Sequence, residues 1–406
     1  MNSLFNGLGY GNYALFAIFA FIIVFASYLI SHIVDATEKR TKFSGVLIAG
    51  TVVAFVSSMP EFTSSLVGIF TTNNPAVASG NLLGGNLFRT AMLGLTLIFY
   101  IMAISRAKTT IVQVSLTVSQ IVIFAIYFLV MWLVRNQFTE NIMTIIFSCI
   151  SGGVLLVYIF NLFIMIKKGK KDEEIVEAEF ANDKPKQKGI QIYFRKYFAK
   201  IKLWKMGLIF VIAALVIVLT SMCIAISTNW ILAYSWGWDA DSPKTGFGYS
   251  LLLGIVTSIP ELITVITLLK LQNVNAAIGD ILGSNMFSCL ILSIVDLVYW
   301  HGNDTLFGKG SQEALIISFW CFVSMVFVGG VLLINYLFRN SKHGRLYYSL
   351  SGIMLGLIFL TYVAYLILSA LGIYMFKPIN PDPGPTLNTS INDLYNTFDI
   401  LKIRLQ

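Results

Sequence analysis

Two stretches of the chain place a proline and a glutamate side by side within long apolar segments: VSSMPEFTSS and, much later, VTSIPELITV. In each stretch a hydroxyl side chain stands four residues before the acid, Ser57 before Glu61 and Thr257 before Glu261, so each pair shares one helix face. Carboxylate and hydroxyl oxygens are the ligands that hard cations such as Ca²⁺, Na⁺ and Mg²⁺ prefer, and no soft ligand stands nearby to favour zinc or copper. The pattern therefore predicts a site for a hard metal ion.

The prolines add backbone oxygens to this chemistry. A proline has no N–H, so Pro60 and Pro260 each leave a carbonyl one turn earlier without its helical donor. A small residue earlier in each stretch exposes further backbone oxygens, and a second serine follows each hydroxyl residue. The ligands expected from the two stretches are Ala54, Ser57, Ser58, Glu61, Gly254, Thr257, Ser258 and Glu261.

A second pair of matching stretches follows the first pair: ASGNLLGGNLFRTAML and AIGDILGSNMFSCLIL. Their glycines allow close helix approach, and packing alone would also explain such small residues. Read in steps of four, the two stretches present further polar side chains on one helix face. The candidates that these stretches add are Asn81, Arg89, Asp280, Ser284 and Ser288, with Gly85 between the first two.

The elements that must position these residues are transmembrane helices. The 406 residues are 57% hydrophobic and only 12% charged, which excludes an ordinary soluble domain. Runs of about 20 apolar residues or more are long enough to span a bilayer. The sequence predicts an all-α polytopic membrane protein with ten transmembrane helices, at 12–34, 43–70, 76–103, 110–134, 140–166, 206–227, 246–271, 275–300, 312–338 and 345–375.

The ten predicted spans divide into two sets of five. Because five is odd, the matched halves cross the membrane in opposite directions, which is the pattern of inverted repeats with a binding site at the midplane. The expected parts are a first five-helix repeat at 1–166 (motif 54–90), a cytoplasmic linker at 167–205, a second repeat at 206–376 (motif 254–289) and an extracytoplasmic tail at 377–406.

The distribution of basic residues predicts the orientation. Most lysines and arginines lie in the odd-numbered connections, above all in the charged segment 167–205. The positive-inside rule therefore places both termini outside the cell and this loop in the cytoplasm of a multi-pass protein of the cell membrane. The aromatic and basic end of the loop suits an anionic lipid surface, and the expected partners are inorganic cations and the lipid bilayer. The sequence predicts neither a nucleic-acid partner nor an obligate protein partner.

A buried acid needs a reason to be there. A carboxylate at the centre of a bilayer costs about 2.5–3.5 kcal/mol on insertion scales. One protonated glutamate used for packing is an ordinary alternative, but two at matched positions favour a function. The chain carries no ATP-binding P-loop motif, which disfavours an ATP-driven pump.

Together the pairs SSMPE with GNLLGGNLF, and TSIPE with GDILGSNMF, resemble the two alpha-repeats of the sodium/calcium exchanger family, within the cation/calcium antiporter superfamily. The resemblance covers the chain outside the linker and tail. It implies ten spans in two inverted sets of five, alternate binding of Na⁺ and Ca²⁺, and sliding of the first and sixth spans that exposes the site to each side. Carried over to this sequence, it implies the ligands Ser57, Ser58, Glu61, Thr257, Ser258, Glu261 and Ser284.

The chain also departs from the family pattern. Gly85 stands where the family usually has a ligating serine, and Arg89 and Ser288 stand where Asn or Asp is usual. Arg89 either forms a structural contact or is a built-in cation that pairs with a glutamate and replaces a transported ion. Since arginine keeps its proton, the second interpretation alters the usual stoichiometry of three Na⁺ per Ca²⁺.

The predicted function is a secondary antiporter that exchanges Ca²⁺ for Na⁺ by alternating access, without cofactor and without enzymatic activity. Two alternatives of the same class are a proton-coupled Ca²⁺ antiporter and a Na⁺-coupled Mg²⁺ antiporter. A cation channel and an intramembrane hydrolase are alternatives of other classes. A hydrolase of this kind would carry aspartates in place of the motif glutamates, and matched helix breaks favour alternating access over a channel.

Overall fold

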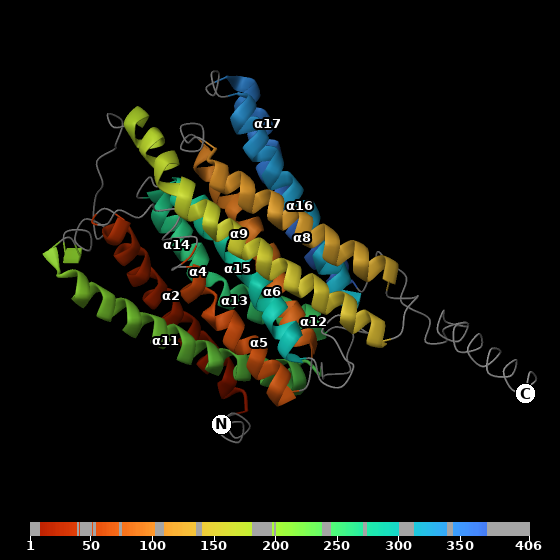
Figure 1. Ribbon diagram of the computed structural model, residues 1–406. Coiled ribbons are helices and arrows are strands. Elements are labelled where there is room, and N and C mark those ends of the chain that lie inside the picture. The colour runs from red at the N-terminus through yellow and green to blue at the C-terminus, as the bar shows by residue number, and fades with distance from the viewer. Residues whose placement is uncertain are drawn as a thin grey trace, which may run out of the picture.

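The computed structural model describes residues 9–38, 40, 51, 54–72, 75–101, 109–134, 140–180, 197–198, 200–237, 245–270, 274–299, 312–338 and 344–371. All regular structure in these ranges is helical, as the sequence predicts (Figure 1). The elements are α2 (Gly11–Glu38), α4 (Ala54–Ser57), α5 (Met59–Thr72), α6 (Pro75–Phe99), α8 (Ile111–Val134), α9 (Glu140–Phe180), α11 (Leu203–Trp230), the π-helix η2 (Ile231–Ser235), α12 (Thr245–Tyr249), the π-helix η3 (Ser250–Gly254), α13 (Ile255–Thr257), α14 (Ile259–Lys270), α15 (Val274–Tyr299), α16 (Gln312–Leu337) and α17 (Arg345–Ala370).

The protein is a multi-span membrane protein. Within the described ranges, eight helices are long and apolar enough to cross a bilayer, or nine if the bent pair Phe247–Thr257 and Ile259–Lys270 is one span. The short helices α4 and α5 fall inside the second expected span, 43–70, whose earlier residues lie mostly outside the described ranges. The tail 377–406 and linker residues 181–196 also lie outside them.

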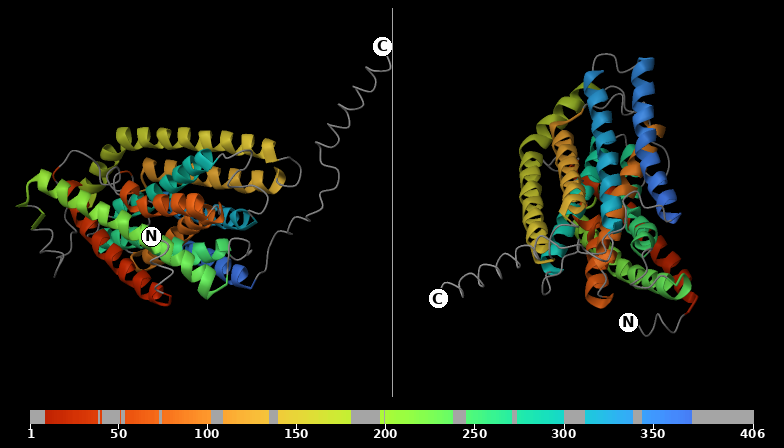
Figure 2. Two further views of the ribbon diagram at one scale, coloured as in Figure 1. Left: turned by 90° about the horizontal axis from the view of Figure 1, so that it is seen from below. Right: turned by 90° about the vertical axis from the view of Figure 1, so that its right-hand side faces the viewer.

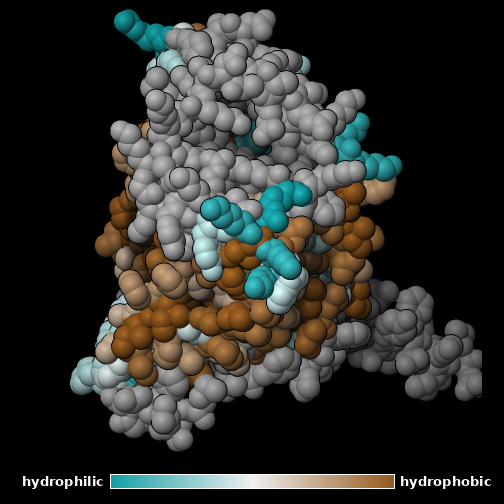
Figure 3. All heavy atoms as spheres, turned by 90° about the vertical axis from the view of Figure 1, so that its left-hand side faces the viewer, coloured by the Kyte–Doolittle hydropathy of each residue, from teal (hydrophilic) through white to brown (hydrophobic). Residues whose placement is uncertain are grey.

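The outer surface of the bundle is apolar. Large side chains such as Phe21, Phe160, Leu215 and Tyr336 are exposed by more than half. The face drawn in Figure 3 is covered mainly by hydrophobic residues where the structure is described. An exterior of this kind suits contact with lipid hydrocarbon.

Helices α6 and α15 form the centre of the bundle. Every residue from Ala78 to Ala91 of α6, and from Val274 to Ser293 of α15, is buried. The two helices pack against each other, and α6 also packs against α5, α16, α17 and η3. Small residues make this close packing feasible, since a Cβ added to Gly84 would lie 2.1 Å from the Ser250 hydroxyl oxygen on η3. The two polar motifs are therefore carried by the most enclosed helices of the molecule.

Helices α2 and α11 pack along each other at one side of the bundle (Figures 1 and 2). Their shared contacts include small clusters of buried apolar side chains, among them Ile23 with Ile224 and Ala26 with Ile217. Helix α2 also packs on α14, and α11 packs on α5. The pair therefore contacts both of the helices that carry the motif glutamates.

Each proline–glutamate stretch coincides with a helix break. Helix α4 ends at Ser57 and α5 begins at Met59, while α13 ends at Thr257 and α14 begins at Ile259. At the second break the chain bends by 42°, and Ser258 donates its backbone N–H to the Ile255 carbonyl at 3.2 Å. The one-residue gap falls two positions before each proline, where a missing N–H weakens the helix.

Candidate cation site

The two motif glutamates meet at one buried guanidinium. Glu61 on α5 and Glu261 on α14 are fully buried, and the side chain of Arg89 on α6 is buried with them. Arg89 Nη1 forms an ion pair and hydrogen bond with Glu61 Oε1, and it lies 3.6 Å from Glu261 Oε1. Two acids from distant parts of the chain thus share one positively charged group.

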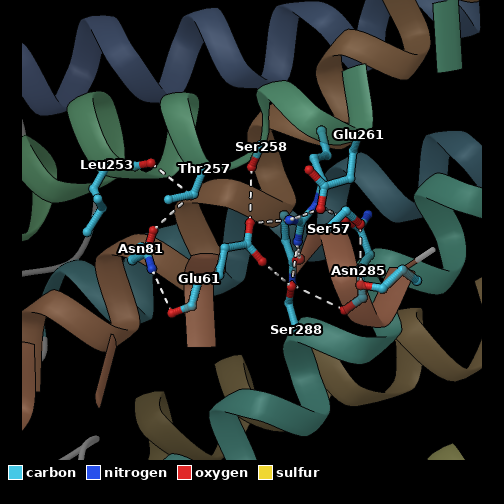
Figure 4. A network of polar contacts seen from close by, with 12 residues as sticks. Ser57, Glu61, Asn81, Leu253, Thr257, Ser258, Glu261, Asn285 and Ser288 are labelled. Atoms are coloured by element: carbon cyan, nitrogen blue, oxygen red, sulfur yellow. Dashed lines mark hydrogen bonds and ion pairs between the residues drawn. The ribbon is translucent and has the colours of Figure 1, made fainter. Parts of the chain in front are cut away.

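The carboxylate of Glu61 is held on both of its oxygens (Figure 4). Oε1 accepts from Arg89 and, at 3.2 Å, from the Ser258 hydroxyl. Oε2 accepts from the Ser288 hydroxyl at 2.8 Å. Charge-assisted hydrogen bonds of this kind are roughly twice as strong as neutral ones, so the Glu61 carboxylate has a fixed position.

The guanidinium of Arg89 is equally well satisfied. Its Nε donates to Asn285 Oδ1 at 3.0 Å, and its Nη2 donates to the Ser288 hydroxyl at 2.6 Å and to Asn86 Oδ1. Asn285 in turn donates from Nδ2 to the Thr90 hydroxyl at 2.8 Å. Helices α6 and α15 together therefore fix the direction of this side chain.

The asparagines around Arg89 were not among the predicted site residues. Asn86 and Asn285 occupy equivalent places in the two matching stretches, where they are the last residues of GGN and GSN. That match was the signal available in the sequence. Which group they would bind depends on the contact between α6 and α15, which a single sequence does not specify.

Several buried oxygens near this pair have no hydrogen-bond partner among the described residues. They are both carboxylate oxygens of Glu261, both of Asp280, and the hydroxyls of Ser58 and Ser284. All four residues are fully buried. Buried polar atoms are normally hydrogen-bonded, so an orphaned group of oxygens calls for a ligand or another explanation.

A second polar network holds the first motif to the second. Asn81 Nδ2 donates to the Glu61 carbonyl at 3.2 Å and to the Ser64 hydroxyl at 2.8 Å. Thr257 donates to Asn81 Oδ1 at 3.2 Å and to the Leu253 carbonyl at 2.8 Å. In this conformation Asn81 and Thr257 bind each other and the backbone.

The remaining predicted residues lie around the same centre. Ser57 lies beside Glu261 and donates to the Ala54 carbonyl at 3.3 Å (Figure 4). The Gly254 carbonyl lies 3.7 Å from the Cβ position of Gly85. A Cβ on Gly85 would also lie 3.0 Å from Glu61 Oε1, so glycine leaves room there for the carboxylate that binds Arg89.

The arrangement is built from oxygen ligands. Within the described ranges no three His, Cys, Asp or Glu side chains form a metal cluster. A hard cation here would have to be held by carboxylates supplemented with hydroxyl and carbonyl oxygens, which is the usual ligand set for Ca²⁺ or Na⁺.

Comparison with known proteins decides the family. The sodium/calcium exchanger protein family matches residues 11–167 and 204–369 of this chain. The chain belongs to the sodium/calcium exchanger family. The unmatched segment between the two matched ranges coincides with the predicted linker. The exchanger is therefore a multi-span membrane protein and a cation antiporter, and its family consists of transporters.

Solved structures agree on the fold. The exchanger is similar to the sodium-calcium exchanger NCX_Mj soaked with 100 mM Na⁺ and 10 mM Sr²⁺, at 17% identity and a TM-score of 0.53, over 89% of this chain and 98% of that one. Similarity to the same protein soaked with 2.5 mM Na⁺ and 0.1 mM Ca²⁺ reaches 18% identity and a TM-score of 0.53, with the same coverage. No curated protein matches this chain.

Proposed function

We propose that this chain exchanges Ca²⁺ for Na⁺ by alternating access at a site between Glu61 and Glu261. The observation that carries the proposal is the convergence of these two buried carboxylates on one guanidinium nitrogen. Two acids supplied by separate helix breaks and brought to one point in the membrane are costly, and that cost is offset when they bind a cation. Family membership supports the same class of cargo.

The proposal includes the architecture inferred from the sequence. The ten helical segments form two inverted repeats of five, with α4–α5 and α12–α14 as corresponding broken spans. Both termini face outward and the loop at 167–205 faces the cytoplasm, as the distribution of basic residues favours. With an inward Na⁺ gradient across the cell membrane, the exchanger extrudes Ca²⁺.

Arg89 changes the charge balance of the site. Arginine stays protonated in proteins, so the guanidinium permanently cancels one negative charge beside Glu61. The exchanger therefore carries fewer positive charges per Ca²⁺ than a relative with an uncharged residue at this position. Coupling to protons, and transport of Mg²⁺ in place of Ca²⁺, are the alternatives that the same charge balance supports.

Transport by purified protein in liposomes tests the function. We expect uptake of ⁴⁵Ca²⁺ to be driven by an outward Na⁺ gradient, and Glu61→Gln and Glu261→Gln each to reduce it by about a hundredfold or more. Each variant removes a buried negative charge from the site, and Glu61→Gln also leaves Arg89 without its ion-pair partner. Imposed pH gradients and competing Mg²⁺ test the alternatives. Uptake that needs no ion on the opposite side would instead indicate a channel.

A further inference from the structure

The three buried acids of the site differ in how they are satisfied. Glu61 accepts hydrogen bonds from Arg89, Ser258 and Ser288. Neither oxygen of Glu261 and neither oxygen of Asp280 accepts one. Glu61 is therefore hydrogen-bonded directly to the guanidinium, while Glu261 lies only within ion-pair distance of it, at 3.6 Å, and Asp280 accepts no hydrogen bond.

Asp280 faces the same centre as Ser288. Asp280, Ser284 and Ser288 follow one another at intervals of four on α15, so they lie along one face of that helix. Ser288 at the end of this row contacts both Glu61 and Arg89. Asp280 also interacts electrostatically with Glu261 and with Arg89. The row therefore lies along α15 and contacts the ion pair of Glu61 and Arg89 at its Ser288 end.

Two hydroxyls are also unpaired. Ser258 donates to Glu61, whereas its counterpart at the first helix break, Ser58, has no hydrogen-bond partner. Ser284 is also without one, and its counterpart in the first repeat is Gly85, which has no side chain. The unpaired oxygens thus belong to Ser58, Glu261, Asp280 and Ser284, and the paired ones surround Glu61.

The charges divide in the same way. Glu61 and Arg89 cancel, and Glu261 and Asp280 together carry two negative charges when they are ionised as metal ligands. Burying two uncompensated carboxylates is costly, and one divalent cation or two monovalent cations would compensate both.

We infer that the transported cation is held by Glu261 and Asp280 with the hydroxyls of Ser58 and Ser284, and that Glu61 holds Arg89 in place without binding the ion. The inference rests on the proposed function and narrows it to a cargo of one hard divalent cation, or two monovalent cations, per site. Asp280 is a ligand without an equivalent in the first repeat. The corresponding residue there, Asn81, already hydrogen-bonds with Thr257 and with the Glu61 carbonyl.

Equilibrium binding of ⁴⁵Ca²⁺ to purified protein in detergent tests this assignment. We expect Asp280→Asn and Glu261→Gln each to weaken binding by about tenfold or more, because the charge and number of ligands set the affinity. Asp296→Asn is the matched control, since Asp296 is a second buried acid on α15 that accepts from the Ser151 hydroxyl at 2.9 Å. The Ca²⁺ affinity of the Asp296→Asn variant should stay within about twofold of wild type.

A double variant separates the roles of Glu61 and Arg89 without changing Asp280. Glu61→Gln alone should abolish binding, because it releases a guanidinium that already lies 3.6 Å from Glu261. Adding Arg89→Gln removes that competing charge and should restore Ca²⁺ binding. If Glu61 were itself a ligand, the double variant would lack a carboxylate ligand and would bind no better than the single variant.

The outcomes separate the assignment from the function. Loss of binding in the double variant, or unchanged binding in a folded Asp280→Asn protein, would overturn the assignment of ligands while wild-type exchange stands. Absence of gradient-driven ⁴⁵Ca²⁺ uptake by wild type would overturn the proposed function itself. Thermal unfolding and gel filtration identify any variant that has not folded. If Asp280→Asn does not fold, Ca²⁺ binding by the double variant decides whether the ligand assignment holds.

Discussion

At the scale of single residues, the site is organised around the buried guanidinium of Arg89. Arg89 makes an ion pair with Glu61 and hydrogen bonds with Asn86, Asn285 and Ser288. Removing one member of such a buried pair leaves an uncompensated charge, at a cost of about 3–5 kcal/mol. The residues around Arg89 therefore stabilise this buried pair.

Gly85 provides a direct test of this packing. A methyl group there would lie 3.0 Å from Glu61 Oε1 and 3.1 Å from the Ser258 hydroxyl, so Gly85→Ala must displace the carboxylate. We expect overpacking to cost about 1–3 kcal/mol and to lower the melting temperature in detergent, although alanine favours a helix by about 1 kcal/mol.

The control for this variant is Gly356→Ala on α17, where an added Cβ meets nothing within 4 Å. It gains the same helix propensity without crowding, so its melting temperature should equal or exceed that of wild type. Equal changes in the two variants would show that the space beside Glu61 is not limiting.

Individual site residues were predictable only in part. The sequence predicted that Ser57 and Glu61, and likewise Thr257 and Glu261, share a helix face. Each pair is four residues apart, and this relation depends on one helix at a time. The division of the oxygens into a paired and an unpaired set did not. It depends on contacts such as Ser258 with Glu61, between residues that only the tertiary fold brings together.

At the scale of helices, the boundaries of the predicted spans agree closely with the structure. The run 312–338 corresponds to α16 at Gln312–Leu337, and 275–300 to α15 at Val274–Tyr299, because apolar length is a property of local sequence. Helix α9 differs from its predicted span, since it continues beyond the expected end at 166 to Phe180. Charged residues end an apolar run without ending a helix, so hydropathy alone gave no boundary there.

The paired helices α2 and α11 are joined at one end by Arg40. Its Nη1 donates to the Phe198 carbonyl at 3.2 Å and to the Ile201 carbonyl at 2.6 Å, just before α11 begins. Nearby, Ile33 and Met206 belong to one buried apolar cluster. These contacts hold the end of α2 against the start of α11.

Arg40→Gln should weaken this contact between the end of α2 and the start of α11. Hydrogen bonds to a charged donor contribute about 1.5–3 kcal/mol each, so their loss raises local opening at the start of α11. We expect hydrogen–deuterium exchange of the amides in 203–210 to become about tenfold faster. The exposed Lys200, replaced by Gln, is the control; equally fast exchange in both variants would contradict a specific role for Arg40.

At the scale of the whole molecule, we expect the fixed guanidinium to affect how much charge moves in one transport cycle. If Arg89 replaces one monovalent cation, Arg89→Asn should let the exchanger accept another, and the charge moved per Ca²⁺ should change by about one elementary charge. Simultaneous recording of current and ⁴⁵Ca²⁺ flux in proteoliposomes measures this ratio. Arg89→Lys keeps the charge and is the control.

A ratio that is the same in wild type, Arg89→Asn and Arg89→Lys, with unchanged Ca²⁺ affinity, would reduce Arg89 to a structural residue. A change confined to Arg89→Asn would support the built-in cation. The measurement concerns the complete cycle, so it does not depend on which carboxylates bind the ion.

In the proposed alternating-access cycle, the guanidinium stays in the site when the empty carrier changes orientation. A carrier avoids futile leakage when its vacant site is too negatively charged to change orientation inside a medium of low polarity. On this proposal, the charge of Arg89 would remove part of that barrier. Strict coupling between the Na⁺ and Ca²⁺ fluxes would then depend on the acids that Arg89 does not neutralise, Glu261 and Asp280. Their charge would be what prevents the empty site from changing orientation.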